Sequence, residues 1–288
     1  MTRRYDTVTL LSDLGVVDET VGVLHAVLRD RAPHARVVDL THGIAPHDVR
    51  AGALALARAV AYLPSGVVVA AVDATVNRPI AVEVAGGEGV LLGPDNGLLA
   101  SAVAMAGGGE RAVVLDREQY HLPRPAAVLV VRDVLVSVAA HLCNGVPLAE
   151  LGSEVDVDSL LPGVVPLPRE ADGGALVAEV LWVDAHGACQ LNLGADDLAP
   201  WGLEGVKVQI AFGDANDPQV RVAERAGTAA QLAAGAIGLV VDHTGMLAVV
   251  LDHRSAAGEL GLGVGDQVTV APLAEGHGAP PVAVTLRR

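Results

Sequence analysis

Residues 7–28, TVTLLSDLGVVDETVGVLHAVL, contain the strand–helix unit that decides the fold. Residues 7–11 are predicted to form a buried β-strand that ends at the polar pair Ser12 and Asp13. Apolar residues then follow helical spacing behind Asp18, which we expect to cap the helix. Because strands and helices continue to alternate, the first half of the chain predicts an α/β domain with a mostly parallel sheet and Rossmann-like layers. Ligand groups then belong at the carboxyl ends of its strands.

Local sequence signals also predict the other helices and strands of the first half of the chain. Asp48 is expected to cap an Ala/Leu-rich helix that runs to about Leu63, and Asp133 is expected to cap a helix that runs to Cys143. The remaining elements expected in this half are strands at 36–40, 67–72, 80–84 and 112–115 and a helix at 96–106.

The composition changes at residues 153–174, which hold three prolines and five acidic residues. We therefore expect an N-terminal α/β domain at 1–160, a linker at 161–174 and a C-terminal domain at 175–288. The last of these carries short segments of strand character separated by turns, which is typical of a small antiparallel β-barrel. These strands are expected at 176–183, 188–193, 206–211, 237–241, 247–251, 267–270 and 281–286.

The overall composition excludes several classes of function. The chain has 288 residues, of which 51% are hydrophobic, and a net charge of −15. It can bury a core, and its acidity argues against nucleic acid and anionic membranes as partners. There is no apolar run of membrane-spanning length, and two cysteines make no disulfide framework, so a cytoplasmic protein is expected. Aromatic residues are 2% of the chain, so a ligand site must have mainly aliphatic walls.

Seven short segments carry a resemblance to a known family. They are LSDLG at 11–15 with TVGV at 20–23, DLTHGIAPHDVR at 39–50, VDATVNRP at 72–79, LGPDNGLL at 92–99, RD at 132–133 with AAHL at 139–142, VDAHGACQLNL at 183–193, and RSAA at 254–257 with LGL at 260–262. In this order they resemble the motifs of the S-adenosyl-L-methionine (SAM) hydroxide adenosyltransferases, which are relatives of the fluorinase and chlorinase.

The resemblance implies an N-terminal α/β domain, a C-terminal β-barrel and a homotrimer with SAM sites at the subunit interfaces. It implies attack of water or hydroxide on the ribose C5′ of SAM, with methionine leaving as a neutral thioether. SAM is then the substrate, and neither a cofactor nor a metal is expected. Since the substrate carries its own leaving-group charge, the protein mainly has to align the nucleophile and remove its solvent.

The resemblance also assigns substrate-binding positions. Asp13 matches the aspartate that binds the ribose hydroxyls, and a carboxylate suits two hydroxyl donors. Its other interpretation is a helix cap. His47 stands where the halogenases carry a Trp against the ribose. Asp184 matches the aspartate that holds the methionine ammonium group. Arg254 and Ser255 fall in the segment that meets the methionine carboxylate, where Arg can pair bidentately, although Arg254 also fits a solvated surface arginine.

The catalytic positions depart from the family pattern. The hydrolases surround the water with Asp, Arg and His side chains. Asp73 matches the Asp and Arg78 the Arg, with a shortened loop between them, but the His position is Val130, which has no hydrogen-bonding atom. At the adenine position His186 replaces a Phe and Ala188 replaces an Asn, so both stacking and hydrogen bonding are reduced.

Three functions remain as alternatives. The first is a diverged SAM hydrolase that makes adenosine and methionine. The second is a catalytically impaired trimer that binds SAM or a nucleoside, as the Val130 and Ala188 positions would suggest. The third and least favoured is a SAM-dependent halogenase, because a carboxylate at Asp73 repels a halide.

Overall fold

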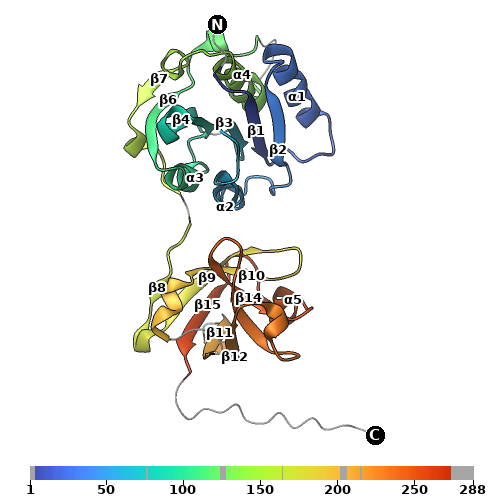
Figure 1. The fold of residues 1–288 in the computed structure, drawn as a ribbon, viewed down its shortest axis with the longest axis vertical. Coiled ribbons are helices and arrows are strands. Elements are labelled where there is room, and N and C mark those ends of the chain that lie inside the picture. Colours follow the sequence, from blue (N-terminus) through green and yellow to red (C-terminus); the bar gives the residue numbers. More distant parts are fainter. Residues whose placement is uncertain are drawn as a thin grey trace. The chain divides into compact units, whose positions relative to one another are not determined.

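The computed structural model describes residues 4–75, 77–123, 128–163, 165–201, 206–214 and 216–273. Contacts between residues divide the chain into two units, Met1–Val164 and Val165–Arg288, called unit 1 and unit 2 below (Figure 1). Within the described residues, no helix is both long and apolar enough to cross a membrane.

Unit 1 is built on a seven-stranded sheet in the order β2-β1-β3-β5-β4-β6-β7. Its strands are β1 (Thr7–Ser12), β2 (Arg36–Thr41), β3 (Gly66–Ala71), β4 (Pro79–Val84), β5 (Gly89–Pro94), β6 (Gly109–Val114) and β7 (Ser153–Val155). The first four strands in the sheet order are parallel, and β4, β6 and β7 pair antiparallel. The carboxyl ends of β2, β1, β3 and β5 therefore share one edge of the sheet.

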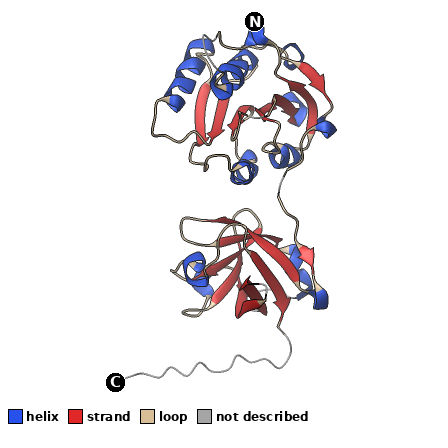
Figure 2. Ribbon diagram, turned by 180° about the vertical axis from the view of Figure 1, so that it is seen from behind, coloured by secondary structure: helices blue, strands red, loops and turns tan. Residues whose placement is uncertain are grey.

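Helices cover both faces of this sheet (Figure 2). They are α1 (Thr20–Arg31), α2 (Val49–Val60), α3 (Ala100–Met105) and α4 (Ser137–Cys143), with a π-helical turn η3 (Val131–Val136) before α4 and the short 3₁₀ helices η1 (Ala85–Gly87), η2 (Glu118–Tyr120), η4 (Leu148–Glu150) and η5 (Val157–Ser159). Leu24 and Leu28 of α1 share a buried cluster with α4 and η3. Leu56 of α2 and Ala102 of α3 belong to a second cluster on the sheet.

The predicted caps have different outcomes. The Asp48 carboxylate accepts the N–H of Ala51 at the start of α2, as predicted. The prediction that Asp133 begins its helix is wrong, because Asp133 lies inside η3 and is only 1% exposed. Its Oδ2 reaches back to the N–H of Leu129 at 2.9 Å, and its Oδ1 pairs with Arg132. A carboxylate one turn into a helix can satisfy a backbone donor before the helix, which sequence spacing does not distinguish from a cap.

Unit 2 is a closed β-barrel, which together with unit 1 confirms the predicted fold class. Its strands are β9 (Leu176–Val183), β10 (Cys189–Gly194), β11 (Lys207–Asp214), β12 (Asp217–Ala226), β13 (Ile237–Val241), β14 (Met246–Leu251) and β15 (Gln267–Pro272), with β8 (Arg169–Glu170) beside β9. The order is β10-β14-β13-β12-β11-β15-β9, and β9 also pairs with β10, which closes the barrel. The pairing of β12 with β13 is parallel, and the other pairings are antiparallel.

Aliphatic side chains from these strands fill the barrel around Phe212, which is 3% exposed. The short helices of unit 2 are η6 (Asp172–Gly174), η7 (Asp196–Trp201), η8 (Ala229–Gln231) and α5 (Ala256–Leu260). The strand β12 was not predicted because most of its side chains are exposed and its apolar alternation is limited to Val220 and Val222. The strand expected at 281–286 lies outside the described residues.

Candidate active site

Three of the predicted site residues meet at the carboxyl edge of the unit 1 sheet. Asp13 follows β1, His47 lies in the loop after β2, and Asp73 follows β3. The Oδ2 atom of Asp13 accepts the backbone N–H of His47 at 3.0 Å and that of Asp73 at 3.1 Å. One carboxylate oxygen thus holds two loops together, and we call these three residues the Asp13 cluster.

The side chains of His47 and Asp73 are joined directly. Nδ1 of His47 lies 2.8 Å from Oδ1 of Asp73. Both residues have left-handed backbone conformations, with φ of 65° at His47 and 50° at Asp73. Such conformations are strained for residues other than glycine and persist where surrounding contacts enforce them, as the two N–H bonds to Asp13 do here. The strain identifies this cluster as a candidate functional site.

A second network, in which Ser12 and His42 are buried and the side chains of Asp39 and His25 are partly exposed, supports the same loops. Nδ1 of His42 lies 2.7 Å from Oγ of Ser12, and Nε2 of His42 lies 3.1 Å from Oδ1 of Asp39. The His42 carbonyl accepts the N–H of Gly15, and His25 also bonds Asp39. Burial raises the pKa of the Asp39 carboxyl, but the hydrogen bonds from the two histidines lower it below the usual value. Ser12 and His42 are both buried, so they position the Asp13 loop and do not contact solvent.

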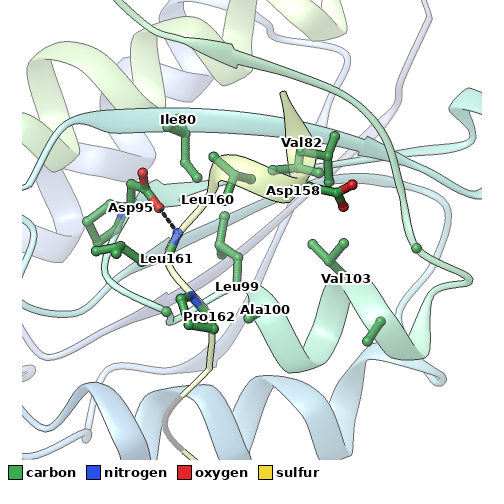
Figure 3. Close-up of a pocket in the computed structure, with 15 residues that line it drawn as sticks. Ile80, Val82, Asp95, Leu99, Ala100, Val103, Asp158, Leu160, Leu161 and Pro162 are labelled. Atoms are coloured by element: carbon green, nitrogen blue, oxygen red, sulfur yellow. Dashed lines mark hydrogen bonds between the residues drawn. The ribbon is translucent and has the colours of Figure 1, made fainter. Parts of the chain in front are cut away.

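Arg78 lies at the same edge of the sheet but is paired elsewhere. Its Nε and Nη2 atoms lie 2.9 Å and 2.8 Å from Oδ2 of Asp95, the residue that follows β5. The other oxygen of Asp95 accepts the N–H of Leu161 at 2.9 Å, as Figure 3 shows. The structure therefore unites Asp13, His47 and Asp73 and fixes Arg78 through Asp95.

Asp95, the partner of Arg78, lines a pocket of about 330 Å³ in unit 1. Figure 3 shows its walls, which are mostly aliphatic: Ile80 and Val82 of β4, Leu99 and Val103 near α3, and Leu160 from the segment after η5. Sequence reasoning did not anticipate this pocket, because its walls come from segments about 80 residues apart whose side chains read as ordinary core. Its Asp95 carboxylate is already bonded, so we assign no chemistry to it.

Val130, at the family's His position, immediately precedes the π-helical turn η3 and packs against the core of unit 1. His121, nine positions upstream in the sequence, bonds the carbonyl of Leu115 through Nε2 at 3.2 Å. The imidazole of the Asp13 cluster is instead that of His47.

Three of the predicted binding residues, together with Ala188, line one pocket of unit 2. A pocket of about 560 Å³ is lined by His186 and Ala188 near the start of β10, by Arg254 and Ser255 after β14, and by Ala229 and Ala230 of η8. The turn that carries His186 touches the segment that carries Ser255. Gly187 has a φ of 82°, and a Cβ built on it would lie 2.0 Å from Oγ of Ser255. This close approach requires glycine at position 187.

Asp184 does not line this pocket but lies in the turn beside it, and the polar groups of the turn and the pocket have partners within unit 2. Oδ1 of Asp184 accepts the N–H groups of His186 and Ala188, both at 2.8 Å, and so shapes the turn. Oγ of Ser255 accepts the N–H of Gly258 and caps α5. The Arg254 guanidinium forms an ion pair with Glu259 and is half-exposed. An incoming carboxylate would compete with Glu259 for Arg254. No group of three or more His, Cys, Asp and Glu side chains that could hold a metal occurs among the described residues.

Comparison with known proteins shows which sequences and structures this chain is similar to. Residues 8–152 match the family described as the SAM hydroxide adenosyltransferase N-terminal domain. The chain is 40% identical over 267 residues to the (R)-S-adenosyl-L-methionine hydrolase of Salinispora tropica, covering 91% of this chain and 97% of that protein. It is 24% identical over 229 residues to a fluorinase of an Actinoplanes species, covering 70% and 76%. A crystal structure of an uncharacterized conserved protein from Thermotoga maritima superposes with a TM-score of 0.81 at 24% identity, over 92% and 99% of the two chains.

Proposed function

The chain belongs to the SAM hydroxide adenosyltransferase family, and from that membership we propose that it is a SAM hydrolase that forms adenosine and L-methionine. The observation that carries this proposal is the 40% identity to a protein named as a SAM hydrolase, over nearly the whole of both chains. The Asp13 cluster and the unit 2 pocket supply two groups of polar residues that suit the two ends of SAM.

We assign the ribose of SAM to the Asp13 cluster. Oδ2 of Asp13 is engaged with the two loop N–H groups, and Oδ1 is the oxygen assigned to a ribose hydroxyl. Asp73 and His47 lie beside it and would face the reacting carbon. We assign Arg78 to the same edge, where its ion pair with Asp95 holds the guanidinium.

We assign the methionine and adenine portions to the unit 2 pocket. Arg254 can exchange its Glu259 partner for the methionine carboxylate, with Ser255 donating beside it. The second oxygen of Asp184 suits the ammonium group, and His186 offers a flat surface to adenine. The two groups of residues belong to different units, and the family resemblance implies a homotrimer in which each site combines unit 1 of one subunit with unit 2 of a neighbour.

The proposed reaction is a displacement at C5′. The water oxygen forms a bond to C5′, the C5′–S bond breaks with its electron pair going to sulfur, and the water loses one proton. The leaving group is a neutral thioether, so alignment and desolvation of the water are the main requirements. The two carboxylates of the Asp13 cluster favour water over a halide, because an anion beside them is repelled. The lower identity to the fluorinase agrees with this order of preference.

The test is incubation of the purified protein with SAM, followed by chromatography for adenosine and methionine in equal amounts. We expect both products, a single trimeric species by light scattering, and no 5′-chloro product in added chloride. Calorimetric titration with SAM separates the binding alternative, since tight binding without adenosine at high protein concentration would show a binder and reject the hydrolase.

A further inference from the structure

Attack by water releases a proton, and a group that accepts it at the reacting centre accelerates this step. The side chain of Val130, at the family's His position, has no atom that can accept a proton. His47 supplies the imidazole of the Asp13 cluster. Its side chain is 74% exposed, whereas the side chain of its partner Asp73 is 25% exposed. We infer that His47 is the general base of the reaction, a role that rests on the hydrolase function proposed above.

The hydrogen bond to Asp73 decides which nitrogen of His47 acts. Nδ1 faces the Asp73 carboxylate at 2.8 Å, so Nδ1 carries the hydrogen and donates it. The lone pair then resides on Nε2, at the opposite side of the ring. The carboxylate also stabilises the imidazolium that forms when Nε2 takes a proton. Asp73 is a positioning residue in this scheme, and Nε2 is the reacting atom.

The backbone fixes this dyad before substrate arrives. His47 and Asp73 come from loops after different strands, yet both N–H groups bond the same oxygen of Asp13. Because the two N–H groups share this one acceptor, both residues are held in strained, left-handed conformations. Such preorganisation spares the site the reordering of two loops in each turnover.

The other histidines described in unit 1 have different surroundings. His42 is buried between Ser12 and Asp39, and His25 bonds the same Asp39. His34 and His121 bond the backbone carbonyls of Cys143 and Leu115. The ring of His141 packs edge to face against Tyr120, with ring centroids 5.1 Å apart. His47 differs from these histidines because its exposed imidazole contacts a carboxylate of the candidate site, that of Asp73.

The proton follows a balanced path. As the water oxygen bonds C5′, one of its O–H bonds breaks and that proton moves to Nε2 of His47. The other hydrogen stays on the same oxygen, which becomes the 5′-hydroxyl of adenosine. The electron pair of the C5′–S bond goes to the methionine sulfur. The imidazolium then returns its proton to bulk water, which the exposure of the ring allows.

The main test uses two substitutions that suit the backbone at position 47. Asn and Gly tolerate a φ of 65° better than other residues, so His47→Asn and His47→Gly should fold. The Asn amide can still donate to Asp73 but cannot accept a proton. We expect kcat to fall about 100-fold or more in both variants, since general bases contribute about 10²–10⁴-fold, with a much smaller change in KM for SAM. Added imidazole should restore part of kcat in His47→Gly and less in His47→Asn.

The matched control is His243→Ala, which removes an exposed imidazole from unit 2 and should leave kcat unchanged with or without imidazole. Asp73→Asn should lower kcat while SAM still binds. Retention of kcat within about threefold in His47→Asn would overturn the assignment. A loss of kcat in His47→Gly that added imidazole does not relieve, with an equally large change in KM, would also overturn it. If the wild-type protein forms no adenosine, the hydrolase function itself fails and the role of His47 fails with it.

Discussion

The backbone N–H of Asp73 donates to Oδ2 of Asp13 across 3.1 Å, although the two residues lie 60 positions apart in the sequence. The contact follows from strand register. Ser12 at the end of β1 pairs with Ala71 at the end of β3, so the residues that follow each strand emerge side by side. The backbone of Asp13 is fixed by the same register, because its N–H donates to the Ala71 carbonyl. The parallel pairing of β1 with β3 thus builds the Asp13 cluster before any ligand is bound.

The first prediction concerns this carboxylate. Asp13→Ala should release both loop N–H groups and destabilise unit 1 by about 2 kcal/mol, since hydrogen bonds to a charged group contribute about 1.5–3 kcal/mol each and the site is partly solvated. Hydrogen exchange followed by mass spectrometry should show faster exchange at the amides of His47 and Asp73. Adenosine formation should be lost.

Asp13→Asn is the matched control for the cluster, because an Asn oxygen can still accept both N–H groups. It should keep the slow exchange of these amides while weakening the contact to the ribose. Equal exchange rates in wild-type protein and Asp13→Ala would show that the loops do not depend on Asp13.

Parts of this arrangement could be predicted from the sequence. The apolar run at 7–11 and the polar pair after it identify β1, and Asp48 identifies the start of α2, because both signals are local. The sequence predicts Asp13 directly after a buried strand, and the family resemblance identifies Asp73; their contact follows from parallel pairing. Periodicity detects elements of this kind well.

Other parts depend on contacts that no local pattern encodes. The side chain of Arg78 pairs with Asp95 because β4 and β5 are antiparallel, which brings the start of one beside the end of the other. The left-handed conformation of His47 is held by the bond of its N–H to Asp13, a residue 34 positions away in the sequence. The strand β5 was not predicted because its run is short and bounded by glycines at positions 89 and 93.

The second prediction compares two glycines of unit 2 with similar backbones. Gly187 and Gly245 have φ of 82° and 85°, but a Cβ at Gly187 would collide with Ser255, whereas one at Gly245 would meet nothing within 4 Å. Gly245→Ala should therefore cost about 1 kcal/mol from backbone strain alone. Gly187→Ala should cost about 2–4 kcal/mol, because the turn or Ser255 must also move.

Urea unfolding followed by tryptophan fluorescence measures both variants, since Trp182 and Trp201 belong to unit 2. We also expect Gly187→Ala to raise KM for SAM, because Ser255 and His186 line the same pocket. Indistinguishable unfolding free energies for the two variants would mean that the contact of Gly187 with Ser255 is loose in solution.

The third prediction is a pH dependence of unit 2 that arises from Asp242. Burial raises the pKa of this carboxyl, but hydrogen bonds from Thr244, Gln190 and the N–H of Met246 lower it below its usual value. A carboxyl whose pKa is lower in the folded state stabilises that state above the unfolded pKa of about 3.9, and this stabilisation is lost as the pH falls through the folded pKa.

Asp242→Asn isolates this contribution, because it keeps an oxygen acceptor and removes the titration. The wild-type advantage in unfolding free energy over this variant should be present at pH 7 and should shrink below about pH 4. Urea unfolding by tryptophan fluorescence at both pH values measures the difference. A constant difference at all pH values would show that the native hydrogen bonds do not depend on the charge of Asp242.

The fourth prediction uses one buried thiol in each unit as a reporter of local opening. Burial raises the pKa of Cys143 in unit 1 to about 12 and that of Cys189 in unit 2 to about 11. Because the thiolate is the reactive form, both thiols should resist iodoacetamide at pH 8 in the native protein and react when their own unit unfolds. Mass spectrometry of peptides containing each cysteine, sampled along a urea series, gives the stability of each unit separately. Reaction of Cys189 at lower urea than Cys143 would show that the barrel opens while the sheet of unit 1 stays folded, whereas alkylation of either thiol within minutes in native buffer would contradict its burial.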